Sequence, residues 1–160
     1  MRIIEGSRSA TGLKFAVVVS RYNDFVTDRL ERGALGALAA AGVADDDVTV
    51  IRVPGAFELP IAARLAANTH EFDGIVCLGC LIRGATPHFE YISSAVAHGL
   101  TAAAGETGVP IAFGVLTTNS AEEALERAVD GPSNKGWEAT QATIELALVA
   151  TELSAGTPDA

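Results

Sequence analysis

A histidine follows directly on a turn whose backbone could bind an anion. Residues 79–91 are typical of a buried strand end, a tight turn at Gly84 and a helix start, with Thr86 suited to the N-cap and Pro87 to the first helical position. That places His88 in the first helical turn, beside N–H groups that lack partners within the helix and attract phosphate. Since imidazole titrates near neutral pH, the segment predicts an anion site next to a proton-transferring group. The alternative is a capped helix that carries an exposed histidine.

Further polar and aromatic residues follow the other predicted strands. Tyr22 and Asn23 follow the first, Phe57 and Glu58 follow the second, and Phe113 lies on the fourth. In parallel sheets the carboxyl ends of the strands share one edge, where ligands bind. The rings of Tyr22 and Phe113 can enclose a flat ring, and Asn23 and Glu58 can bind its edge or a polyol chain. Each residue alone also has a structural explanation, as a core aromatic or as a carboxylate near a helix N-terminus.

Metal, redox and nucleotide chemistry are disfavoured by the same reading. Cys77 and Cys80 have C-x-x-C spacing, but they lie inside a predicted strand, where residues three apart face opposite ways, so core packing is expected. His70 and His98 have no ligand-spaced partners and are expected to be structural or exposed, so no metal is predicted. Neither a G-x-G-x-x-G motif nor a Walker loop occurs, which argues against a dinucleotide or ATP.

Composition limits the protein's class and partners. The chain has 160 residues, 49% of them hydrophobic, which is typical of a single globular domain. A net charge of −9 would repel nucleic acid. No apolar run approaches the roughly 20 residues of a membrane span, and residues 1–6 do not resemble a signal peptide. We therefore expect a cytoplasmic protein without nucleic-acid or membrane partners.

The hydrophobic pattern alternates strands with helices. Strands are predicted at residues 13–20, 48–53, 73–82 and 111–116; helices are predicted from a cap at Asn23 or Asp24 to about residue 41, and at about 57–68, 87–104, 120–129 and 134–153. This pattern predicts an α/β fold, a three-layer α/β/α domain with a four-stranded parallel sheet, flavodoxin-like with strand order 2-1-3-4. In the last helix, Ala142, Leu146 and Val149 are expected to face inward. Residues 1–12 are expected to form an arm that adds a strand to another chain's sheet, and residues 154–160 a frayed tail.

Several motifs in this order resemble the lumazine synthase family. They are PGAFELP at residues 54–60, GCLIRGATPH at 79–88, FGVLTT at 113–118, ERA at 126–128 and NKG at 134–136. The resemblance covers residues 13–153. It implies a transferase of riboflavin biosynthesis that catalyses the penultimate step. That enzyme condenses 5-amino-6-(D-ribitylamino)uracil with 3,4-dihydroxy-2-butanone 4-phosphate to 6,7-dimethyl-8-ribityllumazine, phosphate and water, without a metal or organic cofactor.

The resemblance also implies roles for individual residues. It assigns proton transfer to His88 and phosphate binding to Ala85, Thr86 and Arg127. It assigns the pyrimidine and its ribityl chain to Tyr22, Asn23, Ala56, Phe57, Glu58, Cys80, Leu81, Ile82, Phe113 and Lys135. Phe113, Arg127 and Lys135 would reach the site from a neighbouring subunit. Arg127 also has a structural explanation, since a cation suits the end of its own short helix. A helix N-terminus disfavours protonation of His88 and a bound phosphate favours it, so its charge is left open.

Assembly and partners are likewise implied by the resemblance. Family members form homopentamers, and some pack pentamers into icosahedral capsids. The short link at residues 128–134, which contains Gly131, is similar to that of shell-forming relatives, so a shell is expected. Riboflavin synthase is a candidate partner. One rival hypothesis is a flavin-binding or structural shell protein without catalysis, which the presence of Glu58, His88, Arg127 and Lys135 disfavours. Another is a signalling receiver, which would need clustered acids directly after the first strand; residues 20–23 supply none.

Overall fold

A four-stranded parallel sheet forms the middle layer of the computed structural model, which describes residues 1–156. Its strands are β1 (Phe15–Ser20), β2 (Val48–Val53), β3 (Gly74–Ile82) and β4 (Ile111–Thr118), in the order β2-β1-β3-β4. β1 and most of β3 are buried because helices cover both faces, and their sequences are accordingly almost continuously apolar. The predicted three-layer, flavodoxin-like fold with strand order 2-1-3-4 is confirmed.

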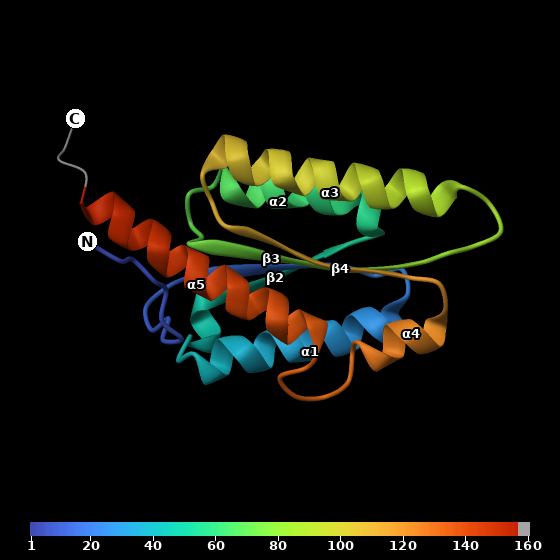
Figure 1. The fold of residues 1–160 in the computed structure, drawn as a ribbon, viewed down its shortest axis with the longest axis horizontal. Coiled ribbons are helices and arrows are strands. Elements are labelled where there is room, and N and C mark those ends of the chain that lie inside the picture. The colour runs from blue at the N-terminus through green and yellow to red at the C-terminus, as the bar shows by residue number, and fades with distance from the viewer. Residues whose placement is uncertain (157–160) are drawn as a thin grey trace.

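Helices cover both faces of this sheet (Figure 1). One face carries α1 (Asp24–Ala40), α4 (Ala121–Glu126) and α5 (Lys135–Ala155), and the other carries α2 (Leu59–Ala67) and α3 (His88–Thr107). Short 3-10 helices, η1 (Asp45–Asp47) and η2 (Ala56–Glu58), precede β2 and α2. Because all four strands are parallel, their carboxyl ends lie at one edge of the sheet, and the turns that follow β1, β2 and β3 lie together there.

Each buried strand contributes to a core on both sides of the sheet. Val17 packs in the core beneath α1 and α5, whereas its neighbour Val18 packs in the core beneath α2 and α3. This alternation separates the cysteines in the same way, with Cys80 in the first core and Cys77 in the second. Both are free, buried thiols, so the predicted packing role and opposite orientation are confirmed.

The start of α5 is fixed by one buried asparagine. The Asn134 side-chain amide donates to the carbonyl oxygens of Arg29 (3.1 Å) and Val129 (3.0 Å), while its oxygen accepts from the backbone N–H groups of Gly136 (2.8 Å) and Trp137 (3.3 Å). The side chain thus caps α5 and joins it both to α1 and to the loop before it. This arrangement holds the loop after α4 and the first turn of α5 against α1.

Some details differ from the sequence prediction. The N-cap of α3 is Pro87, not Thr86, because the ψ angle of Pro87 is 8° and the first helical residue is His88. The inward stripe predicted for α5 is also wrong: Ala142 and Leu146 are exposed, the latter 53%, and Val149 is only partly buried. The buried residues are mostly small ones, which let α5 approach α1 closely, namely Gly136, Thr140, Thr143, Ile144 and Ala147.

The amino-terminal segment lies along α5 of its own chain (Figure 1). Arg2 forms an ion pair with Glu152 at 3.2 Å, and the N–H of the buried Ala10 donates to the Ala41 carbonyl at 2.8 Å. Strand addition to another chain stays a prediction. The predicted tail begins inside α5, which continues to Ala155, and residues 157–160 lie outside the described part of the chain. Within residues 1–156, no helix is long and apolar enough to cross a bilayer.

Candidate functional site

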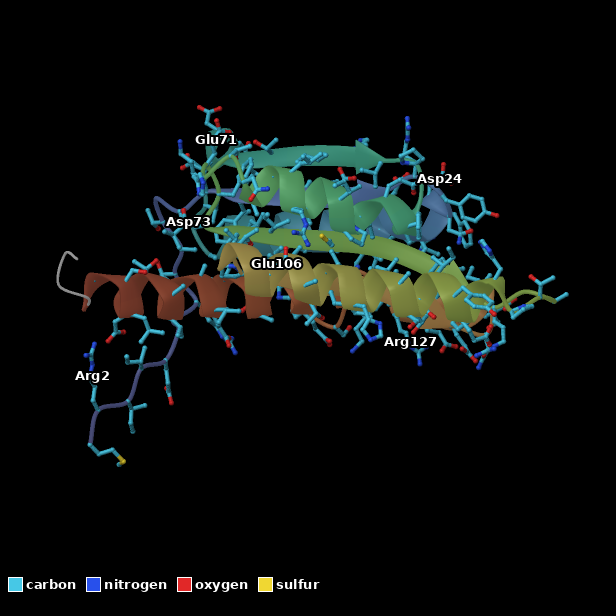
Figure 2. All side chains as sticks on the ribbon, turned by 90° about the horizontal axis from the view of Figure 1, so that it is seen from above. Arg2, Asp24, Glu71, Asp73, Glu106 and Arg127 are labelled. Atoms are coloured by element: carbon cyan, nitrogen blue, oxygen red, sulfur yellow. The ribbon has the colours of Figure 1, made fainter. Side chains whose placement is uncertain are left out.

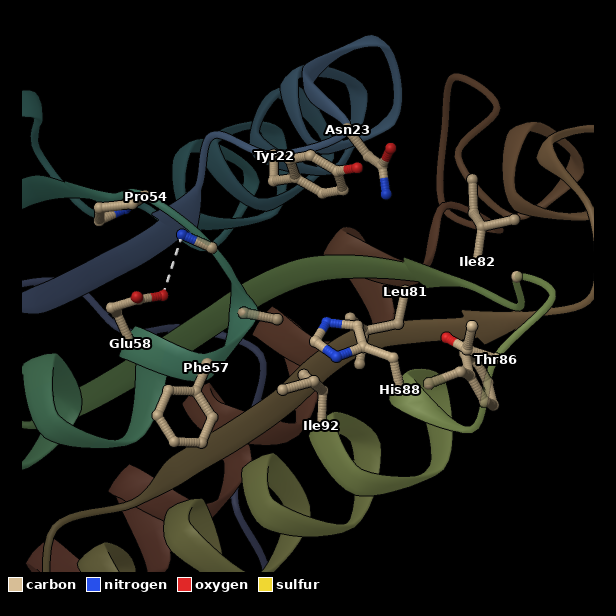
Figure 3. Close-up of a pocket in the computed structure, with 14 residues that line it drawn as sticks. Tyr22, Asn23, Pro54, Phe57, Glu58, Leu81, Ile82, Thr86, His88 and Ile92 are labelled. Carbon is tan, nitrogen blue, oxygen red and sulfur yellow. Dashed lines mark hydrogen bonds between the residues drawn. The ribbon is translucent and has the colours of Figure 1, made fainter.

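A cavity of about 630 Å³ opens at the carboxyl ends of β1, β2 and β3 (Figure 3). Its walls come from the three turns that follow these strands and from the first turns of α3. They are lined by Tyr22, Asn23, Pro54, Gly55, Ala56, Phe57, Glu58, Leu81, Ile82, Gly84, Thr86, His88, Phe89 and Ile92. Among these described residues there is one carboxylate and no lysine or arginine, so the cavity of a single chain supplies no lysine or arginine cation to an anionic ligand.

The turn after β1 places an aromatic ring at the mouth of this cavity. Asn23 adopts a left-handed conformation, with φ 63° and ψ 45°, and its side-chain amide donates to the Cys80 carbonyl at 2.9 Å. It is the N-cap residue of α1, but its side chain does not make the capping bond that the sequence suggested. The N–H of Tyr22 donates to the Pro54 carbonyl at 3.0 Å. The turn is thus held to β3 and to the residue after β2, and Tyr22 is 72% exposed, so its ring is accessible for a ligand to stack on.

The turn after β2 supplies a second aromatic ring and the carboxylate. One carboxylate oxygen of Glu58, Oε2, accepts from the N–H of Gly55 at 3.1 Å, as Figure 3 shows. This bond fixes the side chain and leaves the other oxygen available to accept from a hydroxyl or amine. Phe57 is 61% exposed, which is unusual for phenylalanine and is typical of a side chain that contacts a ligand or another protein.

The turn after β3 presents free backbone donors. Among the described residues, none forms a hydrogen bond with Gly84, Ala85 or Thr86, and all three are exposed. They precede the N-terminus of α3, whose dipole favours an anion. His88, the first residue of α3, projects into the cavity beside this turn (Figure 3). The predicted juxtaposition of unpaired N–H groups and an imidazole is therefore present in the fold.

Three more of the predicted residues lie around a second cavity, of about 410 Å³, at β4 and the start of α5. Phe113, Arg127 and Lys135 line it, and Phe113 is 46% exposed. Arg127 donates to the Glu123 carbonyl at 2.8 Å, and Lys135 forms an ion pair with Glu138 at 2.7 Å. Figure 2 shows Arg127 well apart from Asp24, the residue that follows Asn23.

Two predicted residues line neither cavity. The side chain of Cys80 is buried, and what it offers toward the first cavity is the carbonyl that anchors Asn23. Burial raises the pKa of the Cys80 thiol to about 11 and also raises the pKa of Cys77, so both thiols are neutral at physiological pH. Ala85 belongs to the exposed turn beside the cavity, where its N–H is its only polar donor.

Sequence reasoning missed several residues of the cavity wall. Pro54 lies inside a motif that carried the prediction and Phe89 directly follows His88, so both positions were available as a signal. Ile92 lies one helical turn after His88, and that spacing also places it on the same face of α3. Within residues 1–156, no group of three or more histidine, cysteine or acidic side chains converges as metal ligands would.

Taken together, the first cavity joins three chemical capacities. Tyr22 and Phe57 offer apolar surface to a flat ring, and Glu58 accepts hydrogen bonds from polar substituents. Thr86 belongs to a turn with free N–H donors for an anion, and His88 can exchange a proton between the two parts. Such a cavity suits the joining of a polar heterocycle to an anionic partner.

Comparison with known proteins supports this chemistry. The family model described as 6,7-dimethyl-8-ribityllumazine synthase matches residues 12–151. A protein of Syntrophus aciditrophicus (strain SB) named 6,7-dimethyl-8-ribityllumazine synthase is 52% identical over 144 residues, which cover 90% of this chain and 94% of that protein. The matched region contains every residue that lines the two cavities.

Proposed function

The chain belongs to the 6,7-dimethyl-8-ribityllumazine synthase family, and we propose that it catalyses the reaction for which that family is named, in riboflavin biosynthesis. In this reaction, 5-amino-6-(D-ribitylamino)uracil condenses with 3,4-dihydroxy-2-butanone 4-phosphate to the lumazine, phosphate and water. The observation that carries the proposal is the single cavity in which a slot for a flat ring adjoins a turn of unpaired N–H groups and His88.

The pyrimidine would bind between the turns after β1 and β2. Its ring would stack on the exposed face of Tyr22, and its polar edge and ribityl hydroxyls would meet Glu58 and the backbone near Leu81. Because Glu58 is already fixed by Gly55, its free oxygen is oriented before the substrate arrives. This preorganisation reduces the conformational entropy that the side chain loses when the substrate binds.

The phosphorylated ketone would bind at the turn before α3. The N–H groups of Ala85 and Thr86 would hold its phosphate, with Arg127 of a neighbouring subunit as the cation that the first cavity lacks. The amine of the pyrimidine then attacks the ketone, water leaves and an imine forms. Phosphate is eliminated next, and the donors that bound it stabilise the departing charge. Closure of the second ring releases a further water.

His88 would move protons between these steps. It lies at the start of α3, beside the turn that would hold the phosphate, so it can take a proton from the attacking amine and return one as water leaves. Proton transfer of this kind contributes about 10²–10⁴-fold. Positioning two substrates in one cavity contributes more, since it turns a bimolecular step into an intramolecular one. We therefore expect His88→Ala to lower the activity without abolishing it.

A site completed by a neighbouring copy requires an assembly. We propose a ring of five copies in the cytoplasm, with pentamers packed into an icosahedral capsid that could associate with riboflavin synthase. Support for this comes from the exposed Phe113 at the second cavity and from the short link after α4, where Gly131 has a φ of 97°. Light scattering across buffers and pH tests it: particles much larger than a pentamer are expected, and a pentamer under all conditions would contradict the capsid.

The enzymatic proposal is tested with the purified protein and both substrates. Product formation is followed by absorbance, and phosphate release is measured in parallel, since both must appear in equal amounts. Arg64→Ala serves as the control because its ion pair with Glu106 lies at the far end of α3 from the cavity. Binding of the pyrimidine or of a flavin without any product would refute the enzyme and favour the non-catalytic shell protein.

The two substrates should respond to different substitutions. Arg127→Ala is expected to raise KM mainly for the phosphorylated ketone, because it removes a cation that would bind phosphate. Tyr22→Ala is expected to raise KM mainly for the pyrimidine, because it removes the stacking surface. Steady-state kinetics with each substrate varied in turn gives both values. Equal damage to both KM values in both variants would contradict this division.

A further inference from the structure

Arg83, the residue before the anion-binding turn, links the end of β4 to the first turn of α3. Its backbone N–H donates to the Thr118 carbonyl at 2.8 Å, and its Nε donates to Oδ1 of Asn119 at 3.0 Å. Its Nη1 forms an ion pair with the carboxylate of Glu90, and its guanidinium lies 4.6 Å from the centroid of the Phe89 ring. One side chain thus binds the end of β4 and the first turn of α3 together.

The turn between these attachments has little support of its own. Residues 84–87 are exposed, and in the described chain no hydrogen bond holds Gly84, Ala85 or Thr86. A Cβ atom added at Gly84 would meet nothing within 4 Å, so packing does not restrain the turn either. The position of its N–H groups, and of His88 directly after them, therefore depends on what holds its two ends.

We propose that Arg83 is a positioning residue that sets the geometry of the anion-binding turn and of His88. This inference rests on the proposed function, in which that turn holds the phosphate of the ketone. The planar guanidinium can donate in two directions while stacking on Phe89, which a lysine ammonium cannot reproduce. An exposed ion pair of this kind adds little to global stability, but a small displacement of preorganised donors costs much in catalysis.

A second explanation for Arg83 is that its charge alone attracts the phosphate. A change at Glu90 distinguishes the positioning explanation from the charge explanation. The pKa of Glu90 is lowered by its own backbone N–H and by Arg83, so its carboxylate is ionised at neutral pH. Glu90→Gln keeps the cation and removes the opposing charge, so attraction by charge alone predicts tighter phosphate binding. Positioning predicts weaker binding, because the neutral glutamine amide accepts a weaker hydrogen bond than the carboxylate and holds Arg83 to α3 less firmly.

The test compares Arg83→Lys and Glu90→Gln with Arg64→Ala, which breaks an Arg–Glu pair of similar exposure at the other end of α3. We expect kcat/KM for the phosphorylated ketone to fall about 10-fold or more in the first two, with KM for the pyrimidine unchanged within about twofold and no change in Arg64→Ala. Hydrogen–deuterium exchange should rise in the peptide that covers residues 84–91 and nowhere else. A wild-type kcat/KM for the phosphorylated ketone in Arg83→Lys, or tighter binding of the ketone in Glu90→Gln, would overturn the proposal.

A measurement without catalysis separates this inference from the proposed function. Inorganic phosphate should slow exchange of the 84–91 peptide in the wild type and in Arg64→Ala, and about 10-fold more phosphate should be needed for the same effect in Arg83→Lys. If the wild type makes no lumazine, the proposed function fails while this difference can still be observed. Equal phosphate protection in wild type and Arg83→Lys would overturn the positioning role, whatever the enzyme assay shows.

Discussion

Two variants that each retain little activity alone should recover activity when their subunits are mixed. His88→Ala removes the imidazole from the cavity that Tyr22 closes, and Arg127→Ala removes a cation from the second cavity. Each variant alone should retain about 1% of the wild-type kcat/KM or less, because each lacks either proton transfer or an electrostatic contact to the phosphate. If the site combines the two cavities of neighbouring copies, a mixed ring contains some sites with both groups intact.

The size of the recovery follows from how the site is divided. When both variants are co-expressed in equal amounts, each site takes His88 from one subunit and Arg127 from the next. His88 is present in about half of the sites, and Arg127 is present in about half of those. About a quarter of all sites are therefore complete in a head-to-tail ring. Mixed particles should therefore reach about a quarter of wild-type activity, roughly 25-fold above either variant.

The control uses a pair of substitutions within one cavity. His88→Ala mixed with Tyr22→Ala should not recover, because both side chains come from the same chain at every site. Each variant carries a different affinity tag, and mixed particles are purified through both tags in turn. The assay measures the initial rate of product formation by absorbance. Activity of the His88→Ala and Arg127→Ala mixture that stays near the mean of the two variants would refute a shared site and would place Arg127 outside the catalytic machinery or within its own chain's cavity.

Three further substitutions and one chemical probe test the scaffold. Gly136→Ala should destabilise the fold by about 2–4 kcal/mol, because a Cβ there would overlap a carbonyl oxygen of α1, whereas Gly105→Ala, in open space within α3, should stabilise it by up to about 1 kcal/mol; denaturant unfolding measures both. Asn134→Ala should cost about 2–3 kcal/mol, because two partly buried carbonyl groups lose their donor and the buried N–H of Gly136 loses its acceptor; an unchanged midpoint would contradict the anchoring role. Cys77 and Cys80 should resist alkylation at pH 8 in the native protein and react once it is unfolded, because burial keeps both thiols protonated; fast native labelling would show an open core.

The sheet could be predicted from sequence because its signal is local. β2 was predicted at its observed bounds, and the buried runs of β1 and β3 differ from the prediction only at their first residues. β4 extends two residues beyond its prediction, through Thr117 and Thr118, since strand pairing with Leu81 and Ile82 favours an extended chain there. The turns that carry the site were likewise marked by glycine, proline and polar residues directly after each strand.

Details set by distant contacts could not be predicted in this way. The left-handed conformation of Asn23 depends on the Cys80 carbonyl, 57 positions away in the sequence. The buried face of α5 is chosen by its close approach to α1, which favours Thr140 and Ala147 over the larger Leu146. A helical wheel ranks residues by hydrophobicity and contains no information on how near the neighbouring helix lies.

The distribution of charge supports the proposal that the site is divided between neighbouring copies. A chain with a net charge of −9 would bind a phosphorylated substrate, yet the described walls of its first cavity contain no lysine or arginine. The cation nearest in sequence to the anion-binding turn, Arg83, is already paired with Glu90. Arg127 and Lys135 are instead held at the second cavity by the arrangement that Asn134 anchors, beside the exposed Phe113. Backbone N–H groups can orient a phosphate but carry only partial charge, so a cation from outside the chain is what would balance a dianion there. A monomer would then bind the pyrimidine much better than the ketone, and assembly would switch on phosphate binding and catalysis together.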